Sequence, residues 1–113
     1  MNIRQEYIIN NFIKKIDQNF LKIINYTNTV IVKLITYSAS NNIVGNGIIY
    51  IYNTEDNEIK GIFLNRKEIN HIIFNKKNII IDNENNIRLK FQKEFMLEMN
   101  KNDVYKLISL FKL

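Results

Sequence analysis

The chain has 113 residues, of which 46% are hydrophobic and 24% are charged, and it contains no cysteine. This length and composition predict one domain, residues 1–113, with an apolar core and without disulfide bonds, thiol catalysis or a cysteine zinc site. The formal charge of +5 favours contact with nucleic acid or acidic proteins, although a solvated, lysine-rich surface is the simpler explanation. No apolar run is long enough to span a membrane and the N-terminus lacks the pattern of a signal peptide, so we expect a cytoplasmic protein.

Residues 3–26 show the periodicity of an amphipathic helix without proline or glycine. The apolar positions recur at steps of three and four: Ile8, Phe12, Ile16, Phe20 and Ile23. The pattern predicts a helix of about 22 residues, roughly 33 Å long, which exceeds the face that a domain of this size offers. Part of its apolar stripe is therefore expected to project and to need a partner, either another protein or the same helix of a second copy in a homodimer.

From residue 29 the periodicity changes to two, which predicts up to seven short strands. They span residues 30–37, 43–52, 59–64, 69–74, 79–82, 87–91 and 95–99. The asparagine-rich connections are typical of turns and too short for helical crossovers, so the sheet should be antiparallel. In the last two strands Phe91 and Phe95 are expected to face inward, while Arg88 and Lys90 oppose glutamates across the hairpin.

The chain is expected to end in a second helix, capped by Asn100 or Asn102 and with an apolar stripe that includes Leu107 and Phe111. The predicted fold class is α+β: a long N-terminal helix, a six- to seven-stranded antiparallel meander sheet or partly closed barrel, and a C-terminal helix. This element order resembles the pleckstrin-homology-like barrel, whose C-terminal helix plugs one end. Lipid-binding members carry a basic first hairpin loop, whereas residues 38–46 here are uncharged, so phosphoinositide binding at that loop is not expected. The alternative is an open, curved sheet with both helices on one face.

The sequence contains no recognisable catalytic, cofactor-binding or metal-binding pattern. The only histidine, His71, lies within a predicted strand without a recognisable base or orienting group nearby, so we interpret it as structural or surface-exposed. The serines form no nucleophile elbow, the glycines form no phosphate loop, and the acidic clusters lack the glycine and distal glutamate of a calcium loop. We therefore expect a protein that is not an enzyme and needs no cofactor.

Two groups of residues are candidate binding sites. Residues 48–52 are apolar on both faces of their strand, which fits either a central strand covered on both sides or an exposed surface. In the second interpretation Tyr50 and Tyr52, with Tyr37 beside them on an adjacent strand, contact a protein partner. The second group, Arg88, Lys90 and Lys93, is a candidate for contact with nucleic-acid phosphates.

Our leading hypothesis is a non-enzymatic protein-binding module. Its most specific form is a small phage or mobile-element inhibitor of a host defence complex, of the anti-CRISPR kind, because the chain is short, lysine-rich and dominated by residues with AT-rich codons. One alternative is a nucleic-acid-binding accessory protein that uses the basic strand face. The other is an adaptor with a pleckstrin-homology-like fold, or a structural protein that self-associates.

Overall fold

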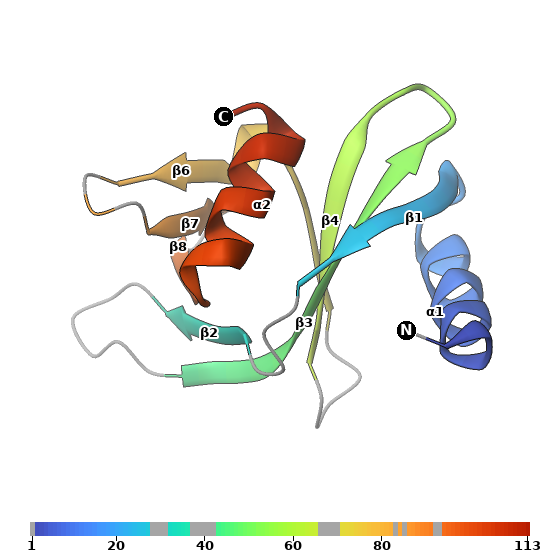
Figure 1. Cartoon of the computed structure of the whole chain (residues 1–113), viewed down its shortest axis with the longest axis horizontal. Coiled ribbons are helices and arrows are strands. Elements are labelled where there is room, and N and C mark those ends of the chain that lie inside the picture. Colours follow the sequence, from blue (N-terminus) through green and yellow to red (C-terminus); the bar gives the residue numbers. More distant parts are fainter. Residues whose placement is uncertain are drawn as a thin grey trace.

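The computed structural model describes residues 2–27, 32–36, 43–65, 71–82, 84, 86–91 and 94–113, with the backbone alone for residues 32–36 and 43–45. Two helices, α1 (Ile3–Ile16) and α2 (Lys101–Phe111), flank a set of eight strands (Figure 1). The strands are β1 (Phe20–Tyr26), β2 (Val32–Thr36), β3 (Ile43–Thr54), β4 (Ile59–Asn65), β5 (His71–Asn75), β6 (Ile79–Ile81), β7 (Ile87–Lys90) and β8 (Glu94–Glu98), and a 3-10 turn, η1 (Lys76–Asn78), joins β5 to β6.

All strand pairs are antiparallel, as predicted, and β3 is the element that joins the two halves of the sheet. The strand order is β5-β4-β3-β2-β8-β7-β6, and β1 also pairs with β3. The first part of β3 pairs with β2, its last five residues pair with β1, and its other edge pairs with β4. The end strands β5 and β6 are not paired with each other among the described residues, so the sheet is a barrel that does not close.

The helices cover opposite faces of β3 and β4, because successive residues of a strand point to opposite sides. Ile49 and Ile51 face a core that also contains Leu107 and Phe111 of α2. Tyr50 and Tyr52, which alternate with them, face a second core under α1. Figure 1 shows the two helices on either side of these strands. The alternative of an open sheet with both helices on one face is therefore wrong, and the partly closed barrel is confirmed.

The first helix is shorter than predicted, because residues 20–26 form β1. Asp17 ends the helix: its backbone is extended, its N–H donates to the Ile13 carbonyl, and its carboxylate accepts a hydrogen bond from the Asn19 N–H at 3.0 Å. Two register shifts in the pairing of β1 with β3 interrupt the strict alternation of the strand. Phe20, Ile23 and Tyr26 therefore pack on one face at a spacing of three, which also fits a helix.

The remaining elements follow the predictions closely. Each of the seven predicted strands is present as β2 to β8, and Asn100 caps α2 through a hydrogen bond from the Asp103 N–H at 2.8 Å. Phe95 packs against the core as expected. Phe91 does not: it lies beyond the end of β7 and is 37% exposed, which corrects the expectation that it faces inward. Neither described helix is long and apolar enough to cross a membrane.

Candidate functional site

The structure does not expose the tyrosine-bearing strand. Tyr50 is 8% exposed and Tyr52 is 0% exposed, because α1 covers this face of β3. The expectation of an exposed tyrosine surface is therefore wrong for these two residues, and the interpretation as a covered central strand is confirmed. Tyr37 lies outside the described residues. Burial and the neighbouring Tyr26, whose ring centroid is 6.3 Å away, raise the pKa of Tyr50.

A polar cluster anchors the end of α1 to the sheet. The Asp17 carboxylate accepts hydrogen bonds from the Tyr52 hydroxyl at 2.9 Å and from the Lys60 ammonium at 3.0 Å. Burial alone would raise the pKa of Asp17, but the hydrogen bonds from Lys60, Tyr52 and the Asn19 N–H outweigh it and lower the pKa. Burial, together with the hydrogen bond to Asp17, raises the pKa of Tyr52. The cluster fixes where α1 leaves the sheet.

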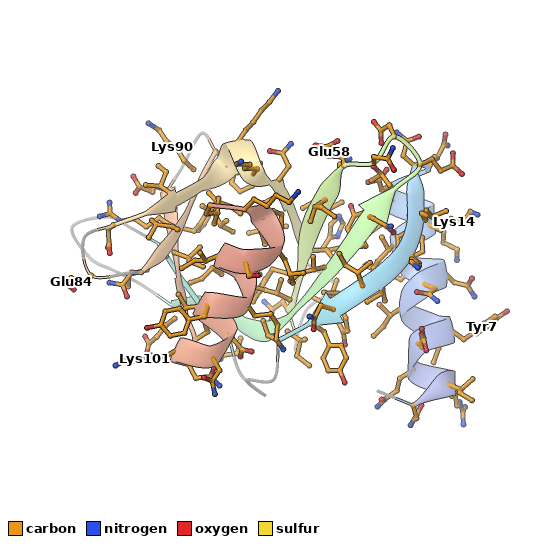
Figure 2. The ribbon with its side chains drawn as sticks, turned by 45° about the horizontal axis from the view of Figure 1, so that its top comes forward. Tyr7, Lys14, Glu58, Glu84, Lys90 and Lys101 are labelled. Atoms are coloured by element: carbon orange, nitrogen blue, oxygen red, sulfur yellow. The ribbon has the colours of Figure 1, made fainter. Side chains whose placement is uncertain are left out.

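The N-terminal half of α1 projects from this anchor. Ile13 is fully buried, whereas three apolar side chains nearer the N-terminus are largely exposed: Ile3 at 87%, Tyr7 at 67% and Ile8 at 57%. We call the stripe formed by Ile3 and Tyr7 the α1 face; Ile8 lies about 100° around the helix from Tyr7. Figure 2 shows Tyr7 pointing away from the rest of the molecule. Exposed apolar side chains are thus present on the first helix as expected, but the overlong helix that was the reason for expecting them is not, and of the three only Ile8 belongs to the predicted apolar stripe.

The projecting end is a well-formed helix. Asn2 and Gln5 form a capping box, in which the Asn2 side chain accepts from the Gln5 N–H at 2.8 Å and the Gln5 side chain accepts from the Asn2 N–H at 3.3 Å. Sequence reasoning missed Ile3 and Tyr7, which are one turn apart on a stripe separate from the buried one. Their spacing behind the Asn2 cap is the sequence pattern that could have identified them.

A cleft of about 200 Å³ separates this part of α1 from β1. Its lining consists of Glu6 from the helix and Ile23, Ile24, Asn25 and Tyr26 from the strand. The α1 face and this cleft are therefore both accessible from solvent.

The cations of the basic strand lie opposite a glutamate, as the sequence predicted. Arg88 forms ion pairs with Glu94 at 3.0 Å and with Asp82 at 3.4 Å, and the exposed Lys90 lies opposite Glu94 in the strand pair. Of the three cations proposed for nucleic-acid contact, Arg88 is thus paired with two carboxylates, and Lys90 lies opposite one of them. The third, Lys93, lies outside the described residues.

His71 is exposed, in agreement with its interpretation as a surface residue. Its ring packs edge-on against Phe12 of α1, with ring centroids 5.8 Å apart. His71 therefore helps to hold α1 against the sheet. Among the described residues, no group of three or more histidine, cysteine, aspartate or glutamate side chains could hold a metal ion.

Solved structures share the fold, among them the following two. One is the Dm DCP1 EVH1 domain in complex with the XRN1 DBM peptide, with a TM-score of 0.59, 15% identity, and coverage of 96% of this chain and 87% of that chain. The other is Dcp1p, with a TM-score of 0.64, 14% identity, and coverage of 90% and 92% respectively. No protein-family model and no curated protein matches the sequence. At these identities the likeness shows the fold alone, and it confirms the expected pleckstrin-homology-like arrangement of the elements.

Proposed function

We propose that this chain is a non-enzymatic protein-binding module whose partner covers the α1 face. The observation that carries the proposal is the exposure of Ile3 and Tyr7 on a capped helix whose other half is firmly seated. Scattered apolar side chains are common on surfaces, but large ones close together on one helical stripe are typical of interaction sites. A domain with this fold binds a peptide elsewhere, since the Dm DCP1 EVH1 domain was solved in complex with the XRN1 DBM peptide.

The charge along the helix indicates what the partner surface should offer. Lys14 lies two turns from Tyr7, and both side chains point away from the sheet (Figure 2). A partner that covers this side of α1 should therefore place an apolar pocket over Tyr7 and an acidic group near Lys14. Tyrosine suits such a contact because its ring buries a large area at a low cost in side-chain entropy.

The test compares Tyr7→Ser with Tyr105→Ser, a change in a tyrosine that is 58% exposed on the other helix. Tagged wild-type and variant chains are purified from the source cells, and the recovered partner is then titrated against each chain by calorimetry. We expect Tyr105→Ser to bind as wild type and Tyr7→Ser to bind roughly 30-fold more weakly, the effect of losing a contact of about 2 kcal/mol. Equal affinities of the two variants, or recovery of no stoichiometric partner, would contradict the proposal.

Two narrower forms of the hypothesis are separated by further measurements. If the partner is a host protein complex that the chain inhibits, the activity of that complex should fall in proportion to the fraction of it that is bound by the chain. Full activity of the saturated complex would contradict inhibition and leave the binding proposal intact. If the partner is instead a second copy, sedimentation should show a dimer that Tyr7→Ser dissociates. That result would assign the α1 face to self-association and contradict a heterologous partner.

A further inference from the structure

A second surface lies at the far end of the barrel from the tip of α1, where three segments distant in sequence meet. The β3–β4 turn, the η1 turn and the C-terminal end of α2 together line a groove of about 660 Å³. This volume is in the usual range for sites that hold small ligands or peptide side chains. We call it the η1–α2 groove. It shares no lining residue with the α1 face, so the inference drawn from it goes beyond the proposed function.

Hydrogen bonds hold the walls of the η1–α2 groove in place. The Asn75 side chain accepts from the Lys77 N–H at 2.9 Å, and its amide group donates to Glu58 at 3.3 Å, which ties η1 to the β3–β4 turn. On the opposite wall, Lys112 takes a left-handed conformation with φ of 55°, and the Leu113 N–H donates to the Ile108 carbonyl at 3.0 Å. The left-handed residue and this hydrogen bond cap the C-terminal end of α2, and they fix the direction of its last side chains.

The floor of the groove is apolar. Phe111 is 3% exposed and packs against Phe74, with ring centroids 5.7 Å apart. Ile59 and Leu110 are partly buried beside it and belong to the packing of the main core. A ligand side chain that enters the groove therefore meets hydrocarbon on a rigid base.

The rim is cationic. Lys76, Lys77 and Lys112 are exposed and line the groove together with one carboxylate, Glu58. Within the described part of the chain, none of the three ammonium groups is in an ion pair, in contrast to Arg88 on β7. The C-terminal end of a helix carries partial negative charge, but Lys112 at this end offsets it. The groove thus combines an apolar floor with an excess of positive charge.

We infer that the η1–α2 groove binds an acidic segment of a partner protein, in which carboxylates flank an apolar side chain. The lysines complement the carboxylates, and the floor accepts the apolar side chain. The second carboxylate oxygen of Glu58 and the amide group of Asn57 can bond to peptide N–H and carbonyl groups. A single-stranded nucleic acid fits less well, because base binding needs exposed aromatic faces and the ring in this groove, Phe111, is buried.

The probe is the peptide Asp-Glu-Leu-Phe-Asp-Glu-amide with fluorescein attached to its N-terminal amine, titrated against the full chain by fluorescence anisotropy. The comparison probes are its neutral analogue with Asn and Gln in place of the acids, and a labelled short oligothymidine. We expect binding of the acidic peptide that weakens as salt is added, because exposed charges are screened, and at least about tenfold weaker binding of the neutral analogue. Binding of the neutral analogue at equal strength, tighter binding of the oligothymidine, or no binding at concentrations up to about 1 mM would overturn the inference.

Two sets of charge reversals locate the site. One variant carries Lys76→Glu, Lys77→Glu and Lys112→Glu. The control carries the same change in charge at exposed lysines outside the groove, Lys15→Glu, Lys22→Glu and Lys101→Glu. An exposed charge pair typically contributes a factor of about two to three, so the first variant should bind the acidic peptide about tenfold more weakly than the control variant. An equal loss of peptide affinity in the two variants would show that the peptide is attracted by the overall charge of the chain, and it would contradict binding in the η1–α2 groove.

Nuclear magnetic resonance of the wild-type chain locates the peptide without any variant, so it tests the groove even if a charge-reversed variant folds poorly. Backbone amide shifts of the wild-type chain are followed during titration with the acidic peptide. Changes concentrated at Lys76, Lys77 and Lys112 support the groove, whereas changes concentrated on α1 or β7 refute it. Because the probe is tested against the wild type, this result does not depend on the outcome for the α1 face.

Discussion

Replacing Tyr52 by phenylalanine tests how α1 is fixed to the sheet. The change removes one hydroxyl and leaves the ring, which packs against Phe20 with ring centroids 5.4 Å apart. The lost hydrogen bond joins a fully buried donor to the Asp17 carboxylate at 2.9 Å. Asp17 keeps its bonds from the Lys60 ammonium and from the Asn19 N–H, so the variant does not leave a buried charge without a partner.

The size of the effect follows from the type of bond. A hydrogen bond to a charged group contributes about 1.5–3 kcal/mol to stability. Since the Asp17 side chain is 10% exposed, water replaces the hydroxyl only in part, and we expect Tyr52→Phe to lose about 2 kcal/mol of unfolding free energy. For a chain of this length that loss lowers the melting temperature by roughly 6–10 °C.

Urea unfolding followed by far-ultraviolet circular dichroism measures this loss, with Tyr105→Phe as the matched control. Tyr105 is exposed, so removal of its hydroxyl should change the free energy of unfolding by less than about 0.5 kcal/mol. If Tyr52→Phe is as stable as Tyr105→Phe, the bond between Tyr52 and Asp17 makes no net contribution, and the anchor must rest on apolar packing instead.

Two further changes test the anchor and the core. Folding lowers the pKa of Asp17. The ionised carboxylate therefore contributes its full stabilisation above the pKa of the unfolded chain, about 3.9, and this contribution disappears as the pH falls through the lower pKa of the folded chain. The deficit in unfolding free energy of Asp17→Asn should therefore be smaller at pH 3 than at pH 7 in urea titrations, and a deficit that does not shrink would contradict this linkage. A Cβ on Gly61 would lie 2.7 Å from Cε2 of the buried Phe74 ring, so Gly61→Ala should cost about 1–3 kcal/mol. Phe74→Leu in the same chain should recover part of that loss, and no recovery would show that the contact with the ring is not the cause.

Residues 20–26 were predicted as part of the first helix but form strand β1, which shows where side-chain periodicity fails to separate a helix from a strand. Strand β1 carries two register shifts, and each shift moves the following side chain to the face that strict alternation would not give it. Phe20, Ile23 and Tyr26 consequently lie on one side at a spacing of three, as in a helix. The Asp17 cap was visible in the sequence as a polar break, Asp17-Gln18-Asn19, and it is where the helix ends.

The candidate sites were predictable to different degrees. The projection of the first helix was expected from a length that proved wrong, because residues 20–26 form β1, and two of the three exposed residues, Ile3 and Tyr7, lie outside the predicted apolar stripe. The burial of Tyr50 and Tyr52 could not be predicted from the sequence, because a strand with two apolar faces can be either a covered central strand or an exposed binding surface. Only the position of α1 over this face decides between them.

By itself the sequence determined the seven strands from β2 to β8, their antiparallel pairing and the capped helix α2, since each depends on side-chain alternation, turn residues or a cap within a few positions. The tertiary structure alone decided which face of β3 lies under α1 and which cations stay unpaired. It also brought Lys76, Lys77 and Lys112 to one rim from segments far apart in the chain. Burial and charge pairing are set by contacts between distant residues, and no local pattern encodes those contacts.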